Sequence, residues 1–140
     1  MNKKIVLLIM GVAVLIGVAI LPGLIHNRKA SSARETGLRL LNEQDYQLGL
    51  VNLRQFGQPE DIEAIVPLLD NKDPDVQAHA ILAMEKLSGH SIRVPAELSG
   101  TGKESMSAGC GLRTDKTELF SQYVFSWKDW WKRQADATDG

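Results

Sequence analysis

The chain has 140 residues and a formal net charge of −1. Of its 16 Lys and Arg residues, two precede a long apolar run near the start, which leaves 14 against 17 Asp and Glu and a formal charge of −3 for the rest. This balance argues against nucleic acid as a partner, because a nucleic-acid-binding domain normally presents a basic stripe, and the single cysteine cannot form an internal disulfide.

An uncharged apolar run extends from Ile5 to Ile25, behind a basic tail of residues 1–4. About 20 apolar residues, at a rise of roughly 1.5 Å each, match a hydrocarbon core of about 30 Å, whereas a cleaved signal peptide has a shorter apolar core. We therefore expect a single transmembrane helix at 5–25, in contact with the lipid bilayer, and a juxtamembrane linker at 26–34. Small residues at 30–33 leave cleavage as the alternative.

Basic residues flank this run on both sides, so the charge rule for orientation is nearly balanced. The short basic tail favours an amino terminus inside and a soluble domain on the periplasmic or extracytoplasmic side. The cytoplasmic side stays open.

Two helical patterns separated by a turn follow at residues 62–89. Asp73 can cap the second helix, Pro74 fits its first turn, and Ser88 with Gly89 supplies the stop. Each pattern has one apolar face: Ile62, Ile65, Val66 and Leu69 in the first, and Val76, Ala80, Ala83, Met84 and Leu87 in the second. We expect a helical hairpin, and because it cannot bury both faces alone, we expect neighbours of the same kind.

This hairpin resembles a HEAT repeat over the segment VPLLDNKDPDVQAHAILAMEKLSG. The similar features are the pair Leu68 and Leu69, the Asp-Pro-Asp-Val turn, the small Ala80 and Ala83, and the closing Leu87 and Gly89. The resemblance implies antiparallel helix pairs stacked into a solenoid that binds other proteins, with no catalytic residues of its own.

A degenerate earlier copy lies about 31 residues upstream, so that HEAT-like repeats are expected over 35–89. Five residues of this copy, Gly49, Leu50, Val51, Leu53 and Phe56, align with Ala80, Ile81, Leu82, Met84 and Leu87. Glycine inside a helix costs roughly 0.5 to 1 kcal/mol relative to alanine. Gly49 therefore predicts a close contact between helices.

Residues 90–117 contain scattered glycines, Pro95 and several hydroxyl residues, a composition typical of a long loop. Loops of this length are either functional or mobile, so His90 and Arg93 at its start are candidates for partner binding. A phosphate-binding loop is rejected, because Glu104 follows Lys103 where the motif needs Ser or Thr. For Cys110 we favour an inert loop cysteine over a reactive thiol.

An aromatic helix is expected at 118–135, before a disordered tail at 136–140. Ser126 to Asp129 resemble a capping box, and Trp127, Trp130 and Trp131 share one helical face. In the structural interpretation Trp127 and Trp131 pack on the last hairpin, with their indole N–H groups hydrogen-bonded or near solvent. In the alternative the tryptophans form an exposed patch that binds a partner or rests at the membrane interface.

The histidines and the cysteine have no metal-ligand spacing, and no nucleophile motif is present, so we expect no catalytic, cofactor or metal residues and no enzyme activity. We expect an all-α protein: a transmembrane helix, a short HEAT-like α-solenoid and a Trp-rich capping helix. Its expected function is that of a single-pass, membrane-tethered adaptor or scaffold that binds a protein partner. The partner-binding candidates are Trp127, Trp130, Trp131, His90 and Arg93.

Two other functions stay open: a structural subunit of a membrane assembly, and a protein that handles a cofactor or chromophore at Cys110 or His90. Self-association is a further expectation, because two repeats and a cap fall short of the three helical pairs that a stable stack usually needs.

Overall fold

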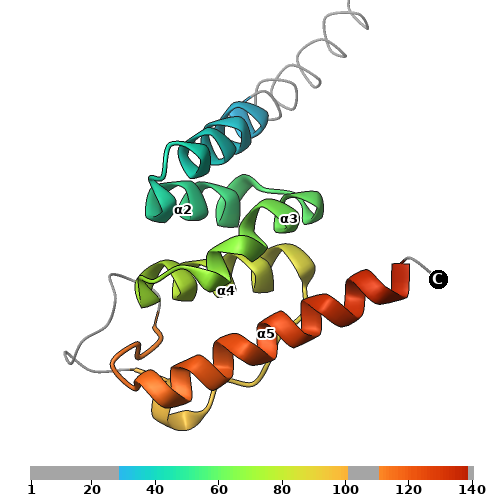
Figure 1. The fold of residues 1–140 in the computed structure, drawn as a ribbon. Helices are drawn as coiled ribbons and strands as arrows, with labels where there is room; N and C mark the ends of the chain where they lie inside the picture. Colours follow the sequence, from blue (N-terminus) through green and yellow to red (C-terminus); the bar gives the residue numbers. More distant parts are fainter. Residues whose placement is uncertain (1–28, 101–110, 139–140) are drawn as a thin grey trace, which may run out of the picture.

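The computed structural model describes residues 29–100 and 111–138. Its layers run in chain order from top to bottom in Figure 1: a helix at residues 29–42, then α2 (Tyr46–Phe56), α3 (Ile62–Ile65) and α4 (Pro74–Ser88), and at the bottom α5 (Thr117–Thr138). The described part of the chain is helical apart from connecting segments and one isolated antiparallel bridge between Ser99 and Leu112.

The predicted fold class is corrected in its membrane part. Within residues 29–100 and 111–138, no helix combines the length and the apolar character needed to cross a membrane. Even α5, with 22 residues, carries charged side chains such as Lys128 and Asp129, whose transfer into hydrocarbon is unfavourable. The predicted span, Ile5 to Ile25, lies outside the described residues. The predictions of a transmembrane helix and of a single-pass membrane location are therefore not supported by the structure.

Residues 29–42 and α2 form a first antiparallel hairpin (Figure 1). The turn between them uses a left-handed residue, Gln44 with φ of 65°, and the backbone N–H of Asp45 donates to the carbonyl of Leu40 at 2.9 Å. The predicted linker at 26–34 is corrected for residues 29–34, which are helical. Alanine at positions 30 and 33 favours this helix.

The predicted close contact at Gly49 is confirmed. A Cβ atom there would lie 2.8 Å from the Cδ2 of Leu41 and 3.0 Å from the carbonyl oxygen of Gly37. Glycine therefore lets the backbones of the two helices of this hairpin approach each other.

The second hairpin comprises η1 (Pro59–Asp61), α3, η2 (Val66–Asp70) and α4. The helix expected over 62–69 is divided near Pro67. Proline has no N–H to donate, and in a regular helix its ring would clash with the carbonyl of Glu63 one turn earlier. The start of α4 follows the prediction: the Asp73 carboxylate accepts from the N–H of Asp75 at 2.9 Å. Gly89, with φ of 68°, ends the helix.

The two hairpins stack with α2 packed mainly on α4. Their burial agrees with the 31-residue offset of the sequence copies. Gly49, Leu50 and Leu53 are buried in α2, as are their counterparts Ala80, Ile81 and Met84 in α4. The offset therefore describes the same inward-facing positions in both layers.

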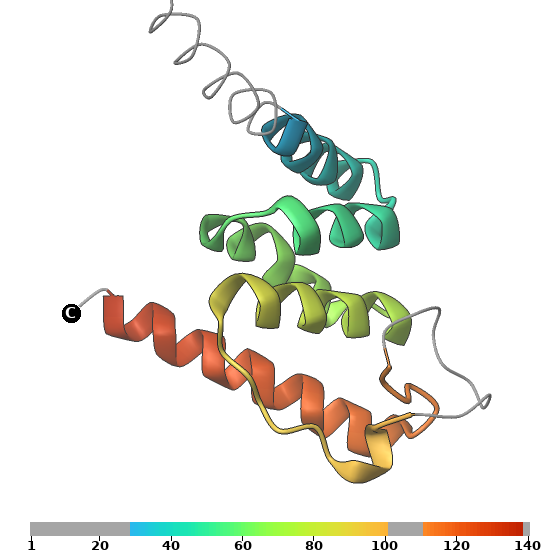
Figure 2. The same ribbon diagram turned by 180° about the vertical axis from the view of Figure 1, so that it is seen from behind.

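Helix α5 lies on the side of α4 away from α2 and packs on α4 and η2 (Figures 1 and 2). It begins at Thr117. Ser126 therefore lies in the middle of the helix, where its hydroxyl donates to the carbonyl of Gln122 at 3.1 Å. The predicted capping box is therefore wrong, because buried Phe120, Tyr123 and Val124 extend the apolar face upstream. The helix also includes residues 136–138 of the predicted tail.

Residues 89–100, here called the strap, run from the end of α4 across α5 (Figure 2). The strap contains the short η3 (Ala96–Leu98) and the bridge residue Ser99. Leu98 and Leu112, the bridge partner of Ser99, are buried in the core. The described ends of the predicted loop at 90–117 are thus packed on the domain.

Candidate interaction surfaces

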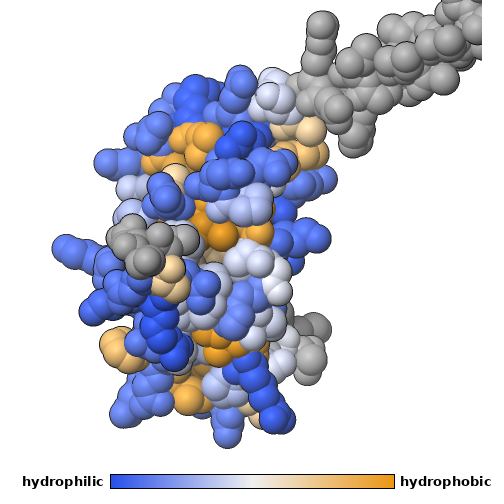
Figure 3. All heavy atoms as spheres, turned by 90° about the vertical axis from the view of Figure 1, so that its right-hand side faces the viewer, coloured by the Kyte–Doolittle hydropathy of each residue, from blue (hydrophilic) through white to orange (hydrophobic). Residues whose placement is uncertain are grey.

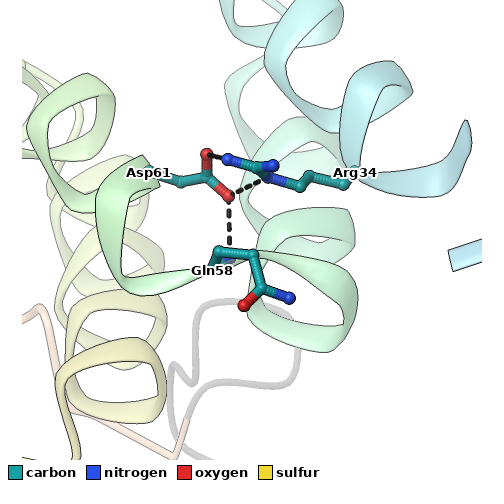
Figure 4. Close-up of polar contacts among 3 residues, drawn as sticks. All are labelled: Arg34, Gln58 and Asp61. Atoms are coloured by element: carbon teal, nitrogen blue, oxygen red, sulfur yellow. Dashed lines mark hydrogen bonds and ion pairs between the residues drawn. The ribbon is translucent and has the colours of Figure 1, made fainter. Parts of the chain in front are cut away.

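Arg34 and Asp61 form a bidentate ion pair that joins the first helix to the start of the second hairpin (Figure 4). The Arg34 Nε donates to Oδ2 at 2.7 Å and Nη2 donates to Oδ1 at 2.6 Å, and the backbone N–H of Gln58 donates to Oδ2 at 2.8 Å. The hydrogen bond from Arg34 lowers the pKa of Asp61 and raises that of Arg34. Because Asp61 is only 4% exposed and its oxygens are occupied, the pair is a structural link.

Four of the five predicted binding residues meet in an aromatic cluster where the strap begins. The His90 ring stacks on Trp130, with centroids 4.5 Å apart and planes 3° apart. Trp127 meets both rings edge-on, at 5.8 Å from His90 and 5.5 Å from Trp130. Trp131 lies 6.1 Å from Trp130. Edge-on and stacked pairs of this kind are the favourable aromatic arrangements.

Within this cluster Trp127 is completely buried, whereas His90, Trp130 and Trp131 are half-buried. The prediction that the indole N–H of Trp127 is bonded or near solvent is wrong, because its Nε1 is buried and has no hydrogen-bond partner among the described residues. Tyr123 donates its hydroxyl to the carbonyl of Ile92 at 3.1 Å, and burial raises its pKa. The cluster thus anchors the strap to α5.

Arg93 is exposed and lies apart from these rings in the strap. It lines a shallow hollow together with Val94, Pro95, Ala96 and Ser99. Cys110, the other loop candidate of the sequence, lies outside the described residues.

Sequence reasoning missed the outward side of α2 and α4, which we call the α2/α4 face. Leu48 and Val51 are 51% and 46% exposed, side by side at i and i+3 on α2. The only sequence signal was a second apolar stripe on α2 beside the buried one at Gly49, Leu50 and Leu53.

Two shallow hollows meet at Val51 on the α2/α4 face. One is lined by Val51, Arg54, Gln55 and Lys86, and the other by Asp45, Gln47, Leu48, Val51 and His79. The face is therefore apolar in the middle, basic toward Arg54 and Lys86, and acidic at Asp45. Among the ion pairs of the described residues, neither Arg54 nor Lys86 takes part.

His79 also lines the second hollow and is 8% exposed. Its pKa is lowered from the ordinary value of 6.5, mainly because burial disfavours the charged ring. Nearby Asp75 and Asp73 oppose this shift, and Arg54 adds to it. The ring is therefore held neutral beneath the exposed leucine and valine.

A second exposed surface lies along α5. Phe125 is 67% exposed, and it lines an open hollow with Thr117, Glu118, Ser121, Gln122 and Ser126. Figure 3, which faces the right-hand side of Figure 1, shows hydrophilic groups over most of that surface, with apolar groups in small separate patches. Exposed large apolar side chains are thus few in the described residues: Leu48, Val51 and Phe125.

No group of three or more His, Cys, Asp or Glu residues in the described ranges is arranged to hold a metal ion. The hollows are shallow and lie on the surfaces of helices and of the strap, a form suited to contact with another macromolecule more than to enclosing a small ligand. Comparison of the chain with protein-family models, with curated proteins and with solved structures found no match.

Proposed function

We propose that this protein is a HEAT-like helical-repeat module that acts as an adaptor or scaffold and binds a segment of a partner protein on its α2/α4 face. The observation that carries the proposal is the exposure of Leu48 and Val51 next to each other between two hollows. The parallel burial of α2 and α4 at a 31-residue offset and the resemblance to HEAT repeats support the same function.

An exposed apolar pair on a folded helix contributes nothing to the core, and burying it against a partner would contribute about 25 cal/mol per Å² of apolar area. Residues at i and i+3 on one helix form a ridge, and the hollows on either side of Val51 accept side chains of a facing segment. An amphipathic helix with its own apolar stripe is the partner element that fits such a surface.

The charges of the face define the partner further. Arg54 and Lys86 line the hollow at one end, and Asp45 lines the hollow at the other. We expect the bound segment to place an acidic side chain near the two cations, since complementary charges fix orientation and accelerate association. Outside its apolar run the chain carries a formal charge of −3, which argues against nucleic acid as the partner.

The test is affinity capture with the full-length chain, followed by titration of the captured protein against single variants. Val51→Asp should weaken binding roughly tenfold or more, because it places a charge at the centre of the contact. Lys86→Glu should weaken binding less and mostly through slower association. Glu63→Gln, an exposed change on α3, is the matched control and should leave binding unchanged.

A partner that binds the wild type and Val51→Asp with equal affinity would show that this face is not the binding site. If the wild type and Val51→Asp capture the same set of proteins, the result counts equally against the proposal.

A further inference from the structure

We propose that two copies of this chain pair through α5, antiparallel, about a twofold axis at Phe125. The two copies would contact each other with the outer stripe of α5, defined as the exposed residues Glu118, Ser121, Gln122, Phe125, Asp129 and Lys132. This stripe faces away from the core, because Phe120, Tyr123, Val124 and Trp127 are buried on the opposite side of the helix.

The arrangement of charge along α5 identifies a second copy of this chain as the partner. Glu118 precedes Phe125 by two helical turns, and Lys132 follows it by two turns, each about 10 Å from the centre. In an antiparallel pair centred on Phe125, Glu118 of each copy meets Lys132 of the other, and the two phenyl rings meet on the axis. A parallel pair would place like charges together. Neither Glu118 nor Lys132 forms an ion pair among the described residues.

The length of α5 supports the same pairing. Its end projects past the layers above it (Figures 1 and 2), and every side chain from Lys132 to Ala137 is exposed. A short helical end without packing is only marginally stable in water. In the antiparallel pair, Lys132 and Arg133 would lie beside the first turn of the partner copy's α5, and residues 134–137 would lie beside residues 113–116 that precede it.

A twofold interface of this kind uses the same patch on both copies and closes after two, so it makes a dimer and not a filament. Around Phe125 the stripe is polar, and a single aromatic contact flanked by two charge pairs predicts a dimer of moderate affinity. The α2/α4 face is not consumed, because α5 lies on the other side of α4 from α2.

The first experiment measures the molar mass of the full-length chain by light scattering and sedimentation over a concentration series, in a mild detergent that keeps the apolar run at 5–25 in solution. We expect a monomer–dimer equilibrium. Phe125→Asp should raise the dimer dissociation constant roughly tenfold or more. Glu118→Lys and Lys132→Glu should each weaken the dimer, and the two changes combined should restore it.

The second experiment tests the orientation by disulfide trapping with Cys110 replaced by serine. Ser121 of one copy faces Asp129 of the other in the antiparallel pair, so Ser121→Cys with Asp129→Cys in one chain should form a covalent dimer on oxidation. Ser121→Cys alone should not, because the two copies of that residue are about 12 Å apart along the axis.

Several results would overturn the proposal. These are a mass that stays monomeric at all concentrations, a dimer unaffected by Phe125→Asp, and a charge exchange that fails to restore pairing. Efficient trapping of Ser121→Cys alone would indicate a parallel pair. Because Phe125 is exposed, loss of fold does not explain its effect, and an unchanged helical circular dichroism signal checks this directly.

Discussion

The two sides of α4 are packed in different ways. The helix α4 itself contributes small and aliphatic side chains to the core, among them fully buried Ala78, Ala80 and Ala83, and the first hairpin has a glycine at the backbone contact between its own two helices. Toward α5, the contact is aromatic, with Phe120, Tyr123 and Trp127 buried and His90 stacked on Trp130. The packing positions of α4 recur in α2 at the 31-residue offset, whereas the aromatic contact with α5 has no counterpart in the first hairpin.

This difference explains why the stack ends at α5. Small buried residues let packed helices approach closely, and Gly49 and Ala80 occupy equivalent buried positions in the two hairpins, so a further hairpin of the same kind could be added to the stack. Bulky rings on α5 fill an irregular space that the strap helps to close, and its outer stripe is mostly polar. A polar outer face is what the terminal element of a helical stack requires.

The largest expected effect is at the aromatic junction. Trp127→Ala should lower the free energy of unfolding by about 3 to 5 kcal/mol, because it removes a completely buried ring and leaves a cavity. Urea unfolding of the full-length chain measures this effect. Ser126→Ala, an exposed change on the same helix outside the outer stripe, is the control and should change stability by less than about 0.5 kcal/mol. Equal effects would contradict the assignment of α5 as a packed cap.

Much of this difference between the two sides could be predicted from the sequence, because several signals are local. Asp73, Pro74 and Gly89 fix the ends of α4 through backbone geometry and capping within a few residues. The helical spacing of the tryptophans also indicated a packed face. The expected helix at 118–135 begins within one residue of α5 at Thr117. The capping box at Ser126 to Asp129 was wrong, because the pattern is satisfied locally while buried Phe120 and Tyr123 continue the helix upstream.

The candidate surfaces were harder to predict, because they depend on neighbours that are distant in sequence. Two apolar stripes on α2 are both compatible with a helix, and only the position of α4 determines that Leu48 and Val51 stay exposed. The pairing of Arg34 with Asp61 spans 27 residues and leaves no periodic signal. The sequence predicts His90 only as a loop residue, and its stacking on Trp130 requires the strap to cross α5.

At the small-residue packing of the first hairpin, we expect Gly49→Ala to destabilise the protein by about 1 to 3 kcal/mol, as an overpacked site. The added methyl group would meet the Cδ2 of Leu41 and the carbonyl oxygen of Gly37. Alanine otherwise favours helix, so Gln55→Ala, at an exposed position of α2, should be neutral or slightly stabilising. Thermal unfolding of both variants separates packing from propensity, and stabilisation by Gly49→Ala would refute the close contact.

The ion pair between the hairpins should be visible as a dependence of stability on acid. The pKa of Asp61 is lowered from its ordinary 3.8, so the pair stabilises the fold above that pH and the contribution is lost as the pH falls through the folded-state value. Asp61→Asn should reduce the melting temperature at pH 7 and flatten its decline below about pH 4. Parallel melting curves for the wild type and the variant in that acid range would contradict this role.

The smallest expected effect is at His79. This position is equivalent in the two layers to exposed Leu48 of α2, but in α4 it holds a buried ring. The folded-state pKa of His79 is below 6.5, so the unfolded chain binds a proton first as the pH falls, and the wild type loses stability below that pH. His79→Gln removes this loss. The difference in free energy of unfolding, wild type minus variant, should therefore fall from pH 7.5 to pH 5, within about 1 kcal/mol for a modest shift. Other titrating groups cancel in that difference. A difference that is constant, or that rises toward acid, would mean that the ring is not held neutral in the fold, and that the hollow above it is open to water.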